Sequence, residues 1–188
     1  MADAILFAVV VCLFSISLHG RSYAVSAKDA NILRAAMFFT AAADFCMLIL
    51  YKNELGLCFF LLVQALHHFR LCGAKRTAFQ AAFCILAAGA ARVLGQSALY
   101  CLTAGYAAAW VFSVTGTFLA YRRFPFPNNL MIVSGMVLFL LCDICVGLYN
   151  TPALREQSGV FWRMIWVFYL PAQLSISVSA KRHKVTIL

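Results

Sequence analysis

The sequence is short of charged residues, of histidine and of any long polar segment. Charged residues make up 11% of the chain and hydrophobic residues 64%, whereas roughly 25% of residues are charged in soluble domains. This composition excludes a soluble globular protein. Since no long polar segment is available to fold outside a membrane, we expect residues 1–188 to form one domain, an all-α bundle of transmembrane helices.

The sequence also lacks the common catalytic and metal-binding motifs. It contains no HExxH, GxSxG or Walker motif and no glycine-rich phosphate cradle, and its four histidines are scattered. We therefore expect no metal site and no cofactor. The eight cysteines lie in apolar segments, where we interpret them as small packing residues.

Apolar segments of membrane-spanning length are what the chain does have. About 20 apolar residues cross the hydrocarbon core as a helix. The connections YKNE, GAKR and GQ are so short that consecutive helices must be antiparallel neighbours. The first segment lacks the basic start and the cleavage site of a signal peptide, so we interpret it as a membrane helix. The seven predicted helices cover residues 4–18, 32–50, 55–72, 77–94, 97–119, 130–149 and 160–179.

The net charge of +9 lies mostly in loops, which argues against nucleic-acid binding. Of the 15 Lys and Arg residues, 11 follow the first, third, fifth and seventh predicted helices, and 4 lie on the opposite side. The positive-inside rule then places the N-terminus outside and the C-terminus in the cytoplasm. We expect a multi-pass protein of a bacterial cell membrane, in contact with membrane lipids.

Two carboxylates lie inside apolar segments, at Asp44 and Asp143, and the other four lie at the N-terminus or near helix ends. A carboxylate in a membrane helix costs about 2.5–3.5 kcal/mol on insertion scales, and it commonly marks a functional site. Both aspartates lie roughly 18–20 Å along helices that run in the same direction. Two arrangements stay open: the carboxylates line one cavity, or each pairs with a separate neighbour, such as Asp44 with Arg92.

Further polar side chains lie at similar depths. Arg92 is the best candidate for a positive partner of the aspartates. Tyr169 and Gln173 are one helical turn apart, and Pro171 between them is expected to kink the helix. We interpret Tyr106 and Trp110 as bundle or interface residues.

Gln64 and His67 can share one helix face, because they are three residues apart. A second interpretation of His67 stays open, in which its side chain reaches the cytoplasmic interface. We expect that behaviour of His68 and Arg70.

Four short segments follow one another in a recognisable order and spacing: FFTAAADFCML at 38–48, FLLVQ at 60–64, VLFLLCD at 137–143 and YLPAQ at 169–173. Together they resemble the YhhN-like lysoplasmalogenase family, in which the similar segments read FSLLGDVLLM, FLLAH, LLFLLSD and YYLAQ. The resemblance covers the second to seventh predicted helices. Gln64 stands where the family often has histidine, Leu170 replaces the second tyrosine, and family members commonly have eight helices.

The resemblance implies hydrolysis of the vinyl ether bond of lysoplasmalogen, a lysophospholipid substrate. Protonation of the vinyl ether gives an oxocarbenium ion, to which water adds, much as glycosidases use two carboxylates on a similar cation. One of Asp44 and Asp143 would be the general acid and the other the base. The expected substrate-binding residues are Gln64, His67, Arg92, Tyr169 and Gln173, with Arg92 on the phosphate.

Two other function classes stay open. A small-molecule or proton-coupled membrane transporter would use seven helices and buried carboxylates equally well. Asp44 and Asp143 each begin an Asp-x-Cys sequence, which is either the remnant of a parallel duplication or chance. The third possibility is a non-catalytic, lipid-binding member of the family.

Overall fold

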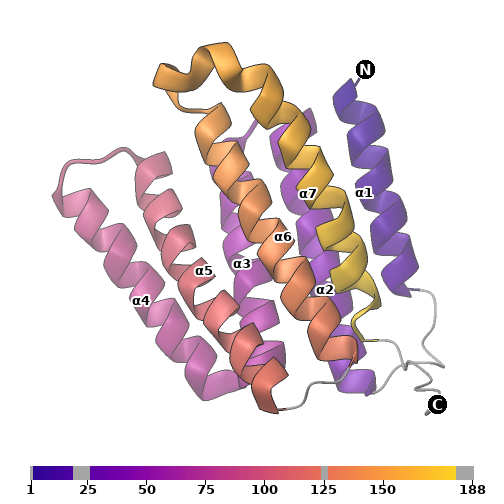
Figure 1. Cartoon of the computed structure of the whole chain (residues 1–188). Coiled ribbons are helices and arrows are strands. Elements are labelled where there is room, and N and C mark those ends of the chain that lie inside the picture. The colour runs from indigo at the N-terminus through magenta and orange to yellow at the C-terminus, as the bar shows by residue number, and fades with distance from the viewer. Residues whose placement is uncertain (1, 19–25, 124–126, 181–188) are drawn as a thin grey trace.

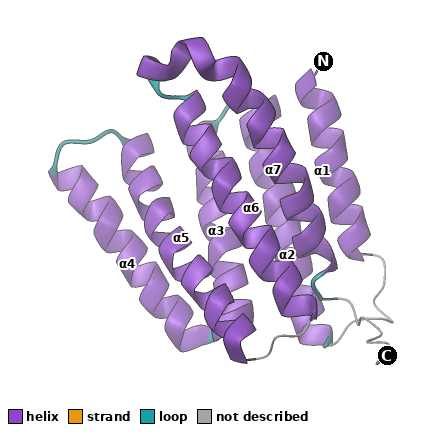
Figure 2. Ribbon diagram, viewed as in Figure 1, coloured by secondary structure: helices purple, strands orange, loops and turns teal. Residues whose placement is uncertain are grey.

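The helices alternate in direction along the chain, as the short connections predict. A computed structural model describes residues 2–18, 26–123 and 127–180. Over these residues the chain has seven α-helices and no strand, so the all-α prediction is confirmed (Figure 2). The helices are α1 (Ala2–Leu18), α2 (Ala27–Asp44), α3 (Asn53–Cys72), α4 (Ala74–Val93), α5 (Ala98–Arg123), α6 (Pro127–Tyr149) and α7 (Ser158–Val178).

Two short segments add to the predicted set. A π-helical segment, Phe45–Ile49, continues α2, and a 3₁₀ segment, Pro152–Gln157, precedes α7. α2 also begins several residues before the predicted start, and the acidic side chain in its first turn, Asp29, is favourable at the positive end of a helix dipole.

Six helices form a ring in which each one packs on the next, in the order α1, α2, α3, α5, α6, α7 and back to α1. α4 lies outside this ring, against α5 and α3, and Figure 1 shows it at one edge of the bundle. Among the described residues, the buried hydrophobic core draws on the six ring helices and contains no α4 side chain. The interior of the ring is therefore where polar side chains of different helices can meet.

Four helical segments are long and apolar enough to cross a membrane: Ala27–Ile49, Asn53–Cys72, Ala98–Arg123 and Asn128–Tyr149. The other helices run alongside them (Figure 1) and carry exposed large apolar side chains such as Ile5, Ile85 and Val167. Apolar surface on this scale is a liability in water but is suited to lipid. By length and composition, the chain is a multi-pass integral membrane protein.

The start of α1 and the end of α7 lie at opposite ends of the bundle (Figure 1). That arrangement follows from an odd number of antiparallel helices. The basic residues Arg21, Lys181, Arg182 and Lys184, on which the predicted orientation partly depends, lie outside the described residues.

A charged network joins four helices at one end of the bundle. The Arg70 guanidinium donates from Nε to Asp29 Oδ1 (2.6 Å) and from Nη2 to Oδ2 (2.8 Å). Its Nη1 donates to Ser179 Oγ (2.7 Å), and Asn128 Nδ2 donates to the Ser179 carbonyl oxygen (2.6 Å). We call these residues the Arg70–Asp29 network. The two-pronged, charge-assisted pair explains why the Arg70 side chain, only 4% exposed, is held against its neighbours at this end of the bundle.

α6 and α7 approach closely at Gly135. A Cβ atom there would lie 3.0 Å from the Ala172 carbonyl oxygen and 2.7 Å from Ile176 Cγ1. Small residues let membrane helices pack backbone against backbone. This contact fixes α6 against α7, the two helices that carry Asp143 and Tyr169.

Candidate functional site

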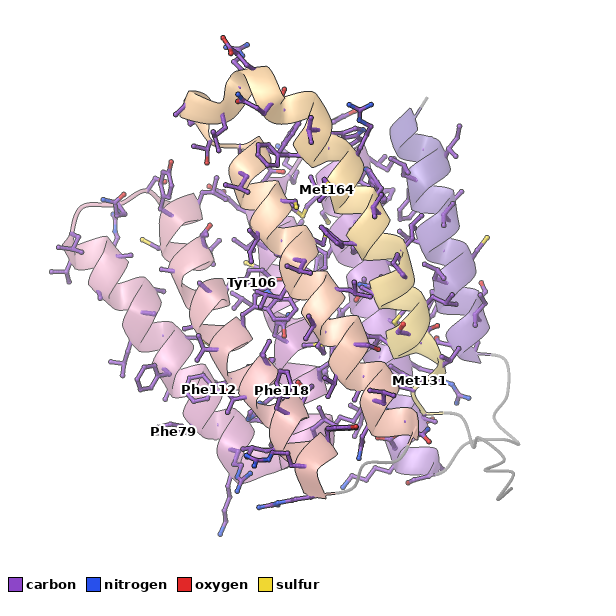
Figure 3. All side chains as sticks on the ribbon, in the orientation of Figure 1. Phe79, Tyr106, Phe112, Phe118, Met131 and Met164 are labelled. Atoms are coloured by element: carbon purple, nitrogen blue, oxygen red, sulfur yellow. The ribbon has the colours of Figure 1, made fainter. Side chains whose placement is uncertain are left out.

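Asp143 of α6 accepts two hydrogen bonds from α5. Tyr106 Oη donates to Asp143 Oδ2 (2.6 Å), and Trp110 Nε1 donates to the same oxygen (2.7 Å). Tyr106 and Trp110 are four residues apart, which puts both donors on one helix face. Figure 3 shows Tyr106 near mid-height of the bundle. As a whole residue, Asp143 is partly buried.

Asp44 occupies the end of α2 and is 7% exposed. The Tyr169 hydroxyl of α7 donates a hydrogen bond to Asp44 Oδ2. The π-helical segment begins at the next residue, and π-helical turns are frequent at functional sites. Met47 of that segment lies against Gly56 of α3, where a Cβ atom would come within 2.3 Å of Met47 Cγ. The wide helical turn is thus held by a close contact rather than left free.

The two aspartates belong to one group of side chains. Asp44 and Asp143 are near enough to repel each other electrostatically, and Tyr169 interacts with both. The Phe139 ring connects their hydrogen-bond donors, with its centroid 5.3 Å from the Trp110 ring and 5.7 Å from the Tyr169 ring. We call the contacting rings the aromatic cluster: Phe60, Tyr106, Trp110, Phe139 and Tyr169.

Two glutamine side chains are buried close to this group. Gln64 is 0% and Gln173 1% exposed, and Gln173 follows Tyr169 by one turn of α7. The Gln64 amide lies beside the Tyr106 hydroxyl. Within the described ranges, three amide atoms have no partner at hydrogen-bond distance and angle: Oε1 and Nε2 of Gln64, and Nε2 of Gln173. A buried polar group left unpaired costs about 1–3 kcal/mol, so these amides are available to a polar ligand.

His67 is buried one turn from Gln64 along α3, and its Nδ1 has no hydrogen-bond partner in the described part of the chain. It lies inside the bundle, which favours the first of its two interpretations. His68 is also buried, with its ring edge-on to Phe112. Phe112 of α5 covers the ring, so the His68 side chain packs inside the bundle.

Arg92 is not brought to the aspartates. It lies exposed on α4, and its Nη1 donates to the Gln96 carbonyl oxygen (3.3 Å). No ion pair joins it to Asp44 or Asp143 among the described residues. The depth expected from the sequence placed Arg92 near the aspartates, but α4 lies outside the ring of helices, so this arginine cannot act as their positive partner.

Sequence analysis missed the two donors to Asp143. It treated Tyr106 and Trp110 as packing or interface residues. The signal that was available is an aromatic pair with hydrogen-bond donors at i and i+4 in an apolar helix, since a buried Tyr or Trp usually needs a partner for its polar end.

The site combines two carboxylates with neutral donors. Its polar groups are phenols, an indole and amides, and no group of three or more His, Cys, Asp or Glu in the described ranges is placed to hold a metal ion. Carboxylates in such surroundings can transfer protons and stabilise positive charge.

Fold and site together define a class: a multi-pass helical membrane protein with two interior carboxylates held by aromatic donors. Comparison with protein-family models, with curated proteins and with solved structures finds no match to this chain. The arguments about function that follow therefore start from the geometry of the site.

Proposed function

We propose that the protein is an intramembrane hydrolase that cleaves the vinyl ether bond of lysoplasmalogen-type lysophospholipids by carboxylate acid–base catalysis. The observation that carries this proposal is the arrangement of Asp44 and Asp143. Each is held through one oxygen by neutral donors, and neither forms an ion pair with a cation in the described part of the chain. The motif resemblance to the YhhN-like lysoplasmalogenase family supplies the substrate class.

The chemistry needs one acid and one base. The acid protonates the β-carbon of the vinyl ether, and the positive charge moves to the ether oxygen and its neighbouring carbon as an oxocarbenium ion. Water adds to that carbon and gives its proton to the second carboxylate. The resulting hemiacetal breaks its carbon–oxygen bond as the second carboxyl group returns its proton to the leaving glycerol oxygen and the first takes the proton of the hemiacetal hydroxyl. An aldehyde and a glycerophospho-base are released, and both carboxyl groups return to their starting states. General acid–base groups typically contribute about 10²–10⁴-fold each.

The hydrogen bonds divide these roles. Asp143 receives two donors on one oxygen, and donors stabilise a carboxylate's negative charge. Asp44 receives one donor and is the more buried of the two. We assign proton donation to Asp44, and stabilisation of the cation and activation of water to Asp143.

The unpaired amides bind the polar part of the substrate. Gln64 and Gln173 offer donors and acceptors close to the carboxylates, as the water and the glycerol hydroxyl require. His67 extends this polar surface along α3. Arg92, outside the ring, is not assigned to the phosphate.

We further propose that all seven helices span a bacterial cell membrane, with the N-terminus outside and the C-terminus in the cytoplasm. The uneven distribution of Lys and Arg supports this orientation. Protease protection of tags at the two termini tests it, and tags protected on the same side would contradict it.

A proton-coupled transporter is the second candidate, and one observation favours it. Buried polar side chains continue from the aspartates toward the Arg70–Asp29 network, with Gln64 and His67 on α3 and Gln173 and Ser177 on α7. Files of polar residues in membrane bundles often mark ion and proton paths.

The deciding experiment is incubation of the purified protein with lysoplasmalogen and measurement of released aldehyde. The matched control substrate is the 1-acyl lysophospholipid, whose ester bond this chemistry does not cleave. We expect aldehyde from the vinyl ether alone. Solute uptake into liposomes without aldehyde release from any vinyl ether would favour the transporter.

A further inference from the structure

We propose that the carboxylate site binds lipophilic organic ammonium ions, with the positive charge between Asp44 and Asp143 and the apolar part on the aromatic cluster. This inference goes beyond the proposed function, since binding requires no bond cleavage. It rests on the charge balance of the site, on the aromatic cluster packed beside the carboxylates and on a buried amide next to it.

The charge balance comes first. All hydrogen bonds that Asp44 and Asp143 receive from described residues come from the uncharged donors Tyr106, Trp110 and Tyr169. When both are ionised, the two carboxylates repel each other. Elsewhere in this chain an acid is neutralised by a cation, since the Asp29 carboxylate pairs with Arg70. Among the described residues, Asp44 and Asp143 have no such cationic partner. A bound cation would relieve the repulsion, whereas a bound anion would increase it.

The aromatic cluster selects the kind of cation. Ammonium groups are attracted to aromatic faces within about 6 Å of the ring centroid, and the Phe139 ring lies in contact with Phe60, Trp110 and Tyr169. Small inorganic cations instead require several oxygen ligands. Two carboxylates surrounded by rings fit an organic ammonium ion better than a hydrated metal ion.

Gln64 provides the independent sign of a ligand. Its amide is fully buried and interacts with the Tyr106 hydroxyl that binds Asp143, but neither Oε1 nor Nε2 reaches a partner at hydrogen-bond distance and angle in the described part of the chain. Its Oε1 can accept a hydrogen bond from an N–H of a primary ammonium.

The test uses probes that share one alkyl chain and differ in charge. Decylammonium, decanol and decyl sulfate are titrated into the full-length protein in a neutral detergent, and binding is measured by calorimetry against protein-free detergent. We expect saturable binding of decylammonium, at least about tenfold tighter than decanol, and no saturable binding of decyl sulfate. Equal binding of decylammonium and decanol would overturn the proposal.

Variants locate the binding. Asp44→Asn and Asp143→Asn should each weaken decylammonium binding about tenfold or more, since each removes a countercharge. The matched control is Glu156→Gln, which removes a carboxylate from an exposed position and should bind like the wild type. Unchanged affinity in both folded Asn variants would refute the site.

A second pair of variants keeps the test decisive if the Asn variants do not fold. Tyr106→Phe keeps the ring and should stay within about threefold of wild-type affinity, whereas Tyr106→Leu should lose about tenfold. Equal affinities in this pair, or displacement of decylammonium by millimolar Na⁺, would overturn the proposal.

The result is separable from the proposed hydrolase. Ammonium binding without aldehyde release from lysoplasmalogen would refute the hydrolase and leave this site intact. Aldehyde release without selective ammonium binding would do the reverse. If both hold, decylammonium should inhibit aldehyde release competitively, because it resembles the charge of the oxocarbenium ion.

Discussion

Asp29 and Asp143 lie in one bundle, but their surroundings differ in kind. Asp29 is 31% exposed and neutralised by the two-pronged Arg70 guanidinium, which also connects α3 to α7. Asp143 has two neutral donors on one oxygen. Both carboxylates join helices, but the one that has no countercharge retains a charge or a proton that it can use. On the proposed function, the two regions separate stability from chemistry.

The largest expected effect is the loss of turnover when one of the two interior carboxylates is replaced. Asp44→Asn and Asp143→Asn should each reduce aldehyde release about 10²–10⁴-fold, because an amide neither supplies the proton nor carries the charge. Folding should persist, since a neutral amide lowers the desolvation cost of a buried acid. Turnover and thermal unfolding of the same preparations measure both.

Gln173→Ala is the matched control for the aspartate variants. It should reduce turnover less, since Gln173 orients the substrate rather than transferring a proton. Unfolded protein in both Asn variants would mean that the aspartates are structural, and the contrast with Asp29 would disappear.

Breaking the ion pair between Arg70 and Asp29 should lower the free energy of unfolding and leave turnover unchanged. Arg70→Met leaves Asp29 without its countercharge and removes the contact with Ser179, so we expect a loss of about 2–4 kcal/mol in unfolding free energy. Denaturation in mixed micelles measures the loss. A double variant that also carries Asp29→Leu should recover part of it, and no recovery would show that the pair does not act as a unit.

Removing a hydrogen-bond donor to Asp143 is expected to lower turnover by an intermediate amount. Trp110→Phe keeps an aromatic ring but removes one hydrogen bond to the carboxylate. Hydrogen bonds to charged groups are worth about 1.5–3 kcal/mol, so turnover should fall at least about tenfold. Trp162→Phe removes an indole N–H outside this site and serves as the control. Equal turnover in the two variants would exclude a role for the donor.

The smallest effect is expected at Arg92. Arg92→Gln should change stability by no more than about 0.5 kcal/mol and leave turnover unchanged, because this side chain lies exposed on α4 away from the carboxylates. Kinetics with lysoplasmalogen check this. A large rise in KM would restore Arg92 as the phosphate ligand.

The sequence predicted how far along its helix a polar residue lies, but it did not predict which neighbouring helix the side chain faces. The apolar segments located the helices to within a few residues, and the position of Asp44 and Asp143 inside them marked the site. Arg92 was placed at a suitable depth, but only the packing of α4 outside the ring decides which way it lies. The hydrogen bonds from Tyr106 and Trp110 join α5 to α6, and nothing local to either helix specifies that pairing.

The way in which both aspartates are held has a stereochemical consequence. All the hydrogen bonds that they accept from described residues end at Oδ2, so each carboxylate is anchored at one oxygen, and its Oδ1 takes no hydrogen bond from these residues. A planar double bond bound beside Asp44 would therefore receive its proton on one face only. In D₂O, the aldehyde would carry deuterium in a single configuration at its α-carbon, and reduction of the aldehyde as it forms would preserve one enantiomer of the labelled alcohol.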